Sequence, residues 1–412
     1  NWLATVLVTP HSLPRMDFSK GIPPESRTLA IVPTMLVSSR NIEGLIEALE
    51  VRYLANRDGN LHFGLLTDLP DAAEEVLLED DALLQLAQQR IEELNEKYGN
   101  AKNDTFFLFH RPRRWNPMER IWMGYERKRG KLAELNSFLR GGSHHHFALI
   151  VGDTAVLSNV KYVITLDTDT QLPRDSARQL VGAMAHPLNR AHYDEGKQRV
   201  VSGYGILQPR VAVSLPGTNR SWYARLNGSD PGIDPYTRAV SDVYQDLFQE
   251  GSFIGKGIYD VDAFELALSG RFPENRILSH DLVEGCFARA GLLSDVMVYE
   301  KYPSRYGTDV SRRHRWIRGD WQLLPWLRSS VPGPGQDRQR RKNPLSPLSQ
   351  WKLFDNLRRS LVPPALTLLL LLGWTLLPSP WFWTASVIGI MLIPSLIFSL
   401  REFLQKPDEV LF

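Results

Sequence analysis

The chain has 412 residues, more than one ordinary domain needs, and a large α/β domain with an additional segment fits this length. Its formal net charge of +2 is close to neutral, so the composition does not indicate a nucleic-acid-binding protein. The one cysteine, Cys286, excludes an internal disulfide framework and fits a reducing compartment.

The first residues do not have the features of a secretion signal. Asn1–Val8 lacks a basic region and a small-residue cleavage site, and Asn1 is not an initiator. We therefore expect this sequence to be an internal fragment of a longer protein, with residues 1–24 forming a lead-in segment.

Strand and helix patterns alternate through residues 25–330, which we interpret as the main domain. The expected strands are Leu29–Val32, ending at Pro33, then Leu61–Leu66, Thr105–His110, Tyr162–Leu166 and Val200–Gln208. The expected helices are Asn41–Tyr53, Glu79–Tyr98 and Lys131–Leu139. Alternation of this kind predicts an α/β fold with a mostly parallel sheet covered by helices.

Two uncharged apolar runs, Leu361–Leu377 and Trp381–Leu400, follow on either side of Pro378-Ser379-Pro380. At about 1.5 Å per residue they would reach roughly 26 and 30 Å, close to the thickness of a bilayer core. The pattern predicts two transmembrane helices within residues 361–400, and a pair of buried core helices is the alternative.

Basic residues on both sides of these runs predict that both ends face the cytoplasm. They are Arg338, Arg340, Arg341, Lys342, Lys352, Arg358, Arg359, Arg401 and Lys406. Residues 331–360 are expected to form a basic linker and an interfacial helix, and residues 401–412 a cytoplasmic tail.

Asp167 and Asp169, in Asp-Thr-Asp-Thr, directly follow the apolar strand Tyr162–Leu166. Two carboxylates at the end of a parallel strand can hold a hard divalent cation that is shared with substrate phosphates. The alternative is a solvated turn.

Asp281 belongs to Ser279-His280-Asp281, which precedes an apolar stretch. Its carboxylate could take the proton from an attacking hydroxyl, as a general base does. The alternative is that Ser279 or Asp281 caps a helix.

Basic clusters suggest where phosphates could bind. Arg312–Trp321 combines arginines for a diphosphate with tryptophans for sugar rings, and a basic helix on anionic lipid is the alternative. Arg127–Asn136 places basic residues at a helix start, or else on a solvated surface. Asp68, after the second strand, could hold a nucleoside or serve only as a turn residue.

Taken in order, Asp68, K-R-G-K-L-A-E-L-N, D-T-D, S-H-D and R-x-x-R-W before an apolar hairpin resemble the processive inverting glycosyltransferases. Cellulose synthase and hyaluronan synthase are familiar members. The resemblance implies a Rossmann-like, nucleotide-sugar-binding GT-A domain. Two residues depart from the family pattern: His280 replaces Glu, and Arg312 replaces Gln.

Longer stretches, including Y-V-I-T-L-D-T-D-T-Q-L-P-R-D and R-R-H-R-W-I-R-G-D-W-Q, look like the glycosyltransferase domain of cyclic β-1,2-glucan synthases. That resemblance implies UDP-glucose as donor, a growing glucan as acceptor and a bacterial inner-membrane location with the catalytic domain in the cytoplasm. It also implies further domains in the same polypeptide as partners, together with the lipid bilayer.

The resemblance assigns roles to individual residues. Asp281 is the implied general base, and Asp169 with Asp167 the implied ligands of Mg²⁺ or Mn²⁺. The residues implied to bind the nucleotide-sugar are Thr34, Asp68, Arg129, Lys131, Asp167, Arg315 and Trp316. Those implied to lie near the acceptor are Gly255, Lys256 and Trp316.

Two other functions stay open. One is a catalytically silent, transferase-like scaffold, against which the joint presence of Asp167, Asp169 and Asp281 argues. The other is a membrane glucan synthase of different linkage, for example β-1,4. The replacements at His280 and Arg312 argue against it.

Overall fold

The computed structural model of the chain describes residues 12–98, 104–214, 217, 221–227, 243–277, 279–334 and 340–404. The chain divides into two compact units, Asn1–Leu353 and Phe354–Phe412. The basic residues Arg338 and Lys406, on which part of the predicted orientation depends, lie outside the described residues. The domain boundaries predicted from the sequence stay predictions.

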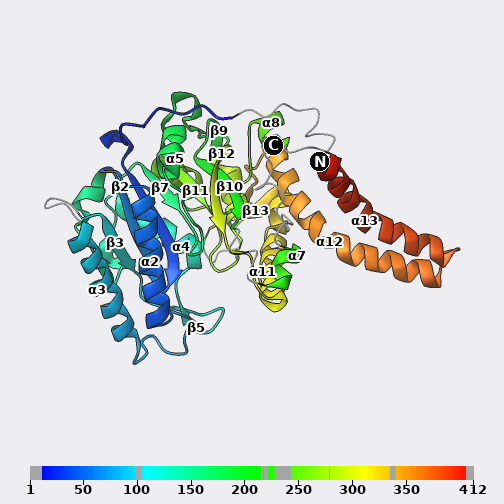
Figure 1. Cartoon of the computed structure of the whole chain (residues 1–412), viewed down its shortest axis with the longest axis horizontal. Coiled ribbons are helices and arrows are strands. Elements are labelled where there is room, and N and C mark those ends of the chain that lie inside the picture. Colours follow the sequence, from blue (N-terminus) through cyan, green and yellow to red (C-terminus); the bar gives the residue numbers. More distant parts are fainter. Residues whose placement is uncertain are drawn as a thin grey trace, which may run out of the picture. The chain divides into compact units, whose positions relative to one another are not determined.

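The first unit is organised around one sheet of eight strands in the order β12-β10-β11-β7-β1-β2-β3-β6 (Figure 1). The strands are β1 (Thr28–Met35), β2 (Leu61–Asp68), β3 (Phe106–His110), β6 (Leu149–Val151), β7 (Tyr162–Thr165), β10 (Ile206–Val213), β11 (Gly257–Asp260) and β12 (Ala290–Glu300). The central β7, β1, β2 and β3 are parallel, whereas β11 and β6 run antiparallel to their neighbours. The sheet is therefore mixed, but six of its eight strands run in one direction, so it is mostly parallel as the sequence predicted.

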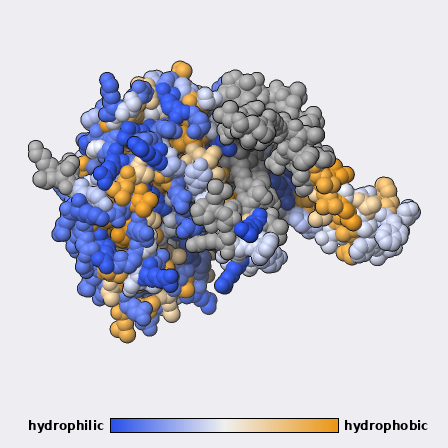
Figure 2. Space-filling model, in the orientation of Figure 1, coloured by the Kyte–Doolittle hydropathy of each residue, from blue (hydrophilic) through white to orange (hydrophobic). Residues whose placement is uncertain are grey.

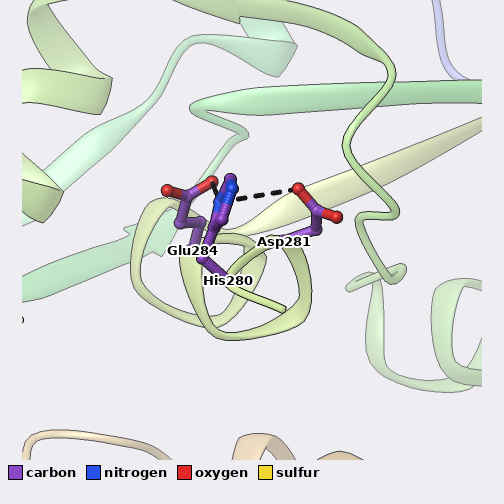
Figure 3. Close-up of side chains that lie close together, drawn as sticks. All are labelled: His280, Asp281 and Glu284. Atoms are coloured by element: carbon purple, nitrogen blue, oxygen red, sulfur yellow. Dashed lines mark ion pairs between the residues drawn. The ribbon is translucent and has the colours of Figure 1, made fainter. Parts of the chain in front are cut away.

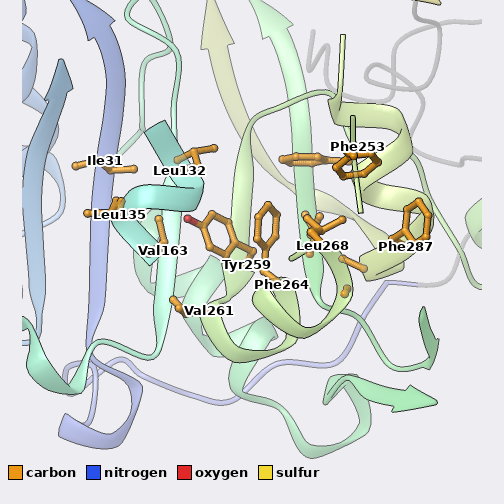
Figure 4. Close-up of a cluster of buried hydrophobic side chains, with 14 of the residues drawn as sticks. Ile31, Leu132, Leu135, Val163, Phe253, Tyr259, Val261, Phe264, Leu268 and Phe287 are labelled. Atoms are coloured by element: carbon orange, nitrogen blue, oxygen red, sulfur yellow. The ribbon is translucent and has the colours of Figure 1, made fainter. Parts of the chain in front are cut away.

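Helices cover both faces of this sheet. They are α2 (Ser39–Ala55), α3 (Asp80–Tyr98), α4 (Arg127–Leu139), α5 (Ser176–Ala185), α9 (Val261–Leu268) and α10 (Asp281–Ala288). Helix α11 (Tyr306–Gln322) follows β12 in the chain. Along β1, Ala30 and Val32 belong to the core shared with α2, α3 and α5, while Leu29 and Ile31 belong to the core shared with α4, α9 and α10 (Figure 4). This alternation is the period of a strand that is buried on both faces.

The mixed α/β fold predicted from the sequence is confirmed, with two differences in its strands. β1 continues past Pro33 to Met35, because beyond Ile31 only β2 pairs with it and the missing proline N–H interrupts no ladder with β7. The single strand predicted over residues 200–208 is two strands, β9 (Arg199–Ser202) and β10, separated at Gly203, whose φ of 63° is left-handed.

The second unit contains most of α12 (Pro347–Thr375) and α13 (Pro380–Leu404). In the part of the chain that the structure describes, no helix combines the length and apolar character needed to cross a membrane, so the spans predicted over 361–400 are not supported there. The first apolar run extends two residues beyond the end of α12. The charge-free part of this helix, Leu361–Thr375, is about 22 Å long at 1.5 Å per residue, whereas the hydrocarbon core of a bilayer is roughly 30 Å thick.

Apolar side chains are nevertheless exposed on this second unit, whereas hydrophilic residues dominate the visible surface of the first (Figure 2). Those of α12 and α13 include Leu368, Leu371, Trp374, Trp381 and Phe382. Within the predicted linker, β13 (Ser330–Pro332) pairs with β14 (Arg340–Lys342), so this segment is partly ordered as two short strands.

Candidate active site

The turn that carries Asp167 and Asp169 follows β7, and the side chain of Arg52 in α2 holds it through hydrogen bonds to its backbone. The buried guanidinium donates to the carbonyl oxygens of Thr168 at 2.9 Å and Thr170 at 2.8 Å. Burial lowers the pKa of Arg52 to about 10, although the Asp169 charge opposes this shift. Arg52 therefore binds only the backbone of the turn, so the carboxylates of Asp167 and Asp169 are available for other contacts.

Asp167 lies between two lysines that come from separate elements. Its Oδ1 is 2.8 Å from Lys128 Nζ, at the start of α4, and its Oδ2 is 3.3 Å from Lys256 Nζ, just before β11. Burial would raise the pKa of the Asp167 carboxyl, but the charges of Lys128 and Lys256 hold it well below its usual range. Asp167 is therefore ionised whenever the protein is folded near neutral pH.

Glu300, at the end of β12, adds a third carboxylate. Its Oε1 lies 2.5 Å from Lys256 Nζ and accepts from Thr170 Oγ1 at 3.0 Å. Asp169 is exposed, yet the protein atoms around it and then the Glu300 charge raise its pKa. Three carboxylates therefore gather with Lys128, Lys256 and Arg52 at this edge. Carboxylate oxygens are the ligands that hard divalent cations such as Mg²⁺ or Mn²⁺ prefer. Among the described residues, however, the group whose potential ligand atoms lie within 4.8 Å of one another is His280, Asp281 and Glu284.

Asp281 begins α10 and faces the loop that precedes β11. A methyl group added at Gly255, whose φ is +87°, would lie 2.6 Å from Asp281 Oδ1, so the glycine backbone packs directly against this carboxylate. The carbonyl of Gly255 accepts from Lys128 Nζ at 2.8 Å. Lys128 consequently joins the Asp167 turn to the loop on which Asp281 rests.

The helix-cap alternative for the S-H-D segment is wrong. The residue at the N-cap of α10 is His280, and its side chain makes no capping hydrogen bond, while Asp281 is already inside the helix. His280 Nδ1 stands between two carboxylates, 3.5 Å from Asp281 Oδ1 and 3.0 Å from Glu284 Oε2 (Figure 3).

Asp68 and Thr34 lie side by side at the ends of β2 and β1, but both are buried. Asp68 pairs with Arg111 through both oxygens, at 2.9 and 3.0 Å, and with Lys131 Nζ at 3.1 Å. Lys131 also donates to the Thr34 carbonyl. Their implied contact with a nucleoside stays a prediction, and the structure gives their polar groups internal partners.

The remaining predicted residues lie apart from these carboxylates. Arg129 pairs with Glu126, and its guanidinium stands 5.5 Å over the Phe272 ring. Arg315 and Trp316 are exposed on α11, where the Arg312 guanidinium lies 4.7 Å over the Trp316 ring. Helix α11 itself packs through Gly319 against Ser279, next to the S-H-D segment.

Sequence reasoning missed three residues of this site: Arg52, Lys128 and Glu300. Lys128 stood in the quoted basic motif, and its position in the first helical turn, three residues before Lys131, was a usable indication. The sequence gave no indication of Arg52 or Glu300, because these residues reach the turn only once α2 and β12 have packed into the fold.

No protein-family model matches this chain. It is 45% identical, over 413 aligned residues, to the cyclic beta-(1,2)-glucan synthase NdvB of Rhizobium meliloti (strain 1021). The alignment takes in 100% of this chain and 14% of that relative, so the chain spans about one seventh of its length.

Among solved structures, the galactosyltransferase LgtC in complex with donor and acceptor sugar analogs aligns with 71% of this chain and 95% of its own, at 9% identity and a TM-score of 0.29. The mannosyltransferase Ktr4p of S. cerevisiae aligns with 64% of this chain and 65% of its own, at 12% identity and a TM-score of 0.23. Scores this low do not establish a common fold, and the fold description rests on the sheet itself. Over its whole length, this chain is similar to one segment of a cyclic β-(1,2)-glucan synthase, which confirms the resemblance read from its motifs.

Proposed function

We propose that the chain is the polymerising, GT-A-type glycosyltransferase domain of a cyclic β-1,2-glucan synthase, which adds glucose from UDP-glucose to a growing glucan. The whole-length similarity to NdvB supports the reaction class. One structural observation supports the site: Lys128 binds both Asp167 and the Gly255 loop that packs against Asp281. A donor-side carboxylate and a candidate base are thereby tied to one side chain.

The proposed reaction is a single displacement with inversion. Asp281 takes the proton of the acceptor hydroxyl as its oxygen forms a bond to the anomeric carbon of the donor, and the bond from that carbon to UDP breaks. The proton ends on the Asp281 carboxylate and the electron pair on the diphosphate. Positioning and charge stabilisation would supply most of the rate enhancement.

A divalent cation, Mg²⁺ or Mn²⁺, would be held by Asp169 and Asp167 with Glu300 beside them, and when bound it would neutralise charge on the departing diphosphate. Lys128 and Lys256 would keep Asp167 ionised for that purpose. Arg315 and Trp316 keep their implied roles at the diphosphate and the sugar, and Gly255 and Lys256 theirs near the acceptor.

We also propose that the domain works on the cytoplasmic side of a bacterial inner membrane. Support comes from Arg358 and Arg359 in the first half of α12 and from the exposed apolar side chains of the second unit. Co-sedimentation with anionic vesicles tests this. Binding equal to that on neutral vesicles, or no binding, would contradict a basic membrane-facing surface.

The test of function is incubation of the protein with radiolabelled UDP-glucose and Mg²⁺ or Mn²⁺, followed by linkage analysis of any polymer. We expect a 2-linked β-glucan, and we expect Asp281→Asn to lower turnover by about 10²- to 10⁴-fold with donor binding retained. A different linkage would keep the transferase and reject the family's polymer. No turnover from the intact parent protein would favour the silent scaffold.

A further inference from the structure

The proposed reaction leaves two buried ionisable groups beside Asp281 unused. The side chains of His280 and Glu284 are 7% and 2% exposed, and the imidazole stands between the two carboxylates (Figure 3). Inside the part of the chain that the structure describes, no hydrogen bond of good geometry reaches His280 Nδ1, Asp281 Oδ1 or Glu284 Oε2. The potential ligand atoms of the three side chains lie within 4.8 Å of one another.

Such an arrangement needs a positive charge at its centre. A neutral imidazole that turned its Nδ1 lone pair toward two carboxylates would leave all three atoms unsatisfied in a buried place, at a cost of several kcal/mol. A proton on Nδ1 reduces the conflict, because the imidazolium then carries a positive charge 3.0 Å from Glu284 Oε2 and 3.5 Å from Asp281 Oδ1.

The surrounding charges are compatible with a proton on His280. Lys128 of α4 acts electrostatically on both His280 and Asp281. Tyr259 of β11 also interacts electrostatically with Glu284. Its hydroxyl donates a hydrogen bond to Asn136 Oδ1 at 2.8 Å, and it adds no charge. One imidazolium beside Asp281 and Glu284 leaves one net negative charge, which Lys128 partly offsets while it also pairs with Asp167.

We propose that His280 is a positioning residue, held as an imidazolium by Glu284, that orients the Asp281 carboxylate and keeps it ionised and ready to accept the proton of the incoming hydroxyl. This inference rests on the proposed function, since it assigns Asp281 as the base. Burial opposes the charged imidazole, but Glu284 and then Asp281 outweigh it and raise the pKa of His280.

The kinetic test compares pH profiles of transfer. His280→Gln removes a cation beside Asp281, so the pKa of the base should rise, and the acidic limb of the profile should move up by about one pH unit. At pH values on that limb the rate should fall about tenfold, whereas well above the limb the two rates should approach each other. Glu284→Gln should reproduce the loss only above the pH at which its His280 becomes neutral.

The matched control is His62→Gln. His62 is equally buried, but burial lowers its pKa to about 4, so it is a neutral core imidazole on β2. Its replacement should lower stability and leave the pH profile unmoved. If His280→Gln lowers the rate without moving the profile, as His62→Gln could through stability alone, the positioning role is wrong.

A second readout does not depend on turnover. In ¹⁵N-histidine-labelled protein, the His280 ring should show the shifts of an imidazolium at pH 7.5 and those of a neutral ring in Glu284→Gln. A neutral ring in the unaltered protein would overturn the proposal, as would stoichiometric zinc that Glu284→Gln removes. A protein that transfers no sugar but shows the imidazolium would reject the function and keep the charged pair.

Discussion

Two networks of charged side chains stand at neighbouring strand ends of the same sheet, and they differ in their access to solvent. The closed network consists of Asp68, Arg111, Glu134 and Lys131, and the open network of Asp167, Lys128, Lys256 and Glu300. In the closed network the Arg111 and Asp68 side chains are 2% and 6% exposed, whereas Asp167 in the open network is 39% exposed.

The residue types are nearly the same, so burial decides what each network can do. In the closed network Asp68 and Glu134 each pair with an arginine or lysine inside the protein. Removing either carboxylate would leave the positive charge of its partner buried without compensation. In the open network the carboxylates remain reachable by a cation or a diphosphate. We infer that the closed network supports the strand ends and that the open network binds ligand.

The largest effect is expected from breaking the closed network. Asp68→Ala leaves Lys131 without its carboxylate and Arg111 with Glu134 alone, and should lower the free energy of unfolding by about 3–5 kcal/mol. Chemical denaturation measures this. If stability stays the same while UDP binding disappears, Asp68 is the nucleoside ligand that the sequence predicts, and the contrast between the networks fails.

A smaller effect is expected at the contact between the open network and the base. Gly255→Ala introduces a methyl group 2.6 Å from Asp281 Oδ1 on a backbone with φ +87°, which should cost about 1–3 kcal/mol of stability and lower turnover at least tenfold. Gly270→Ala is the matched control. Its φ is +62° but nothing lies within 4 Å of the added carbon, so it should show the backbone strain without the loss of turnover.

The sequence predicted the acidic turn, because Asp167 and Asp169 directly follow an apolar strand, and it predicted most strands and helices from their periodicity. It could not predict that Asp68 is buried in an ion pair, because its partner Arg111 lies 43 residues further along the chain. Nor could it predict Arg52, which holds a turn 116 residues away. Nor does composition show that α12 ends at Thr375, two residues before the first apolar run does.

Opening the other network should affect ligands rather than folding. Asp167→Asn removes a partly exposed carboxylate from two lysines, and we expect a change in the free energy of unfolding of about 1 kcal/mol or less. Metal-dependent binding of UDP-glucose, measured by calorimetry with and without Mn²⁺, should weaken at least tenfold. Asp262→Asn, which removes an exposed partner of Arg140, is the control. Unchanged metal-dependent binding in Asp167→Asn would remove the open network from the donor site.

The smallest effect sharpens the description of the closed network. Burial lowers the pKa of Lys131 from 10.5 to about 8, with Asp68 opposing the shift. Between these two values the unfolded chain binds more protons at this position than the folded protein does, so this lysine makes the free energy of unfolding rise with pH. Lys131→Met should remove that rise. Denaturation curves would then show the stability of the unaltered protein increasing relative to the variant between pH 8 and pH 10. A constant difference across that range would mean that Lys131 stays charged in the fold, held by Asp68 more strongly than burial opposes it, and the closed network would then be a true ion-pair cluster throughout.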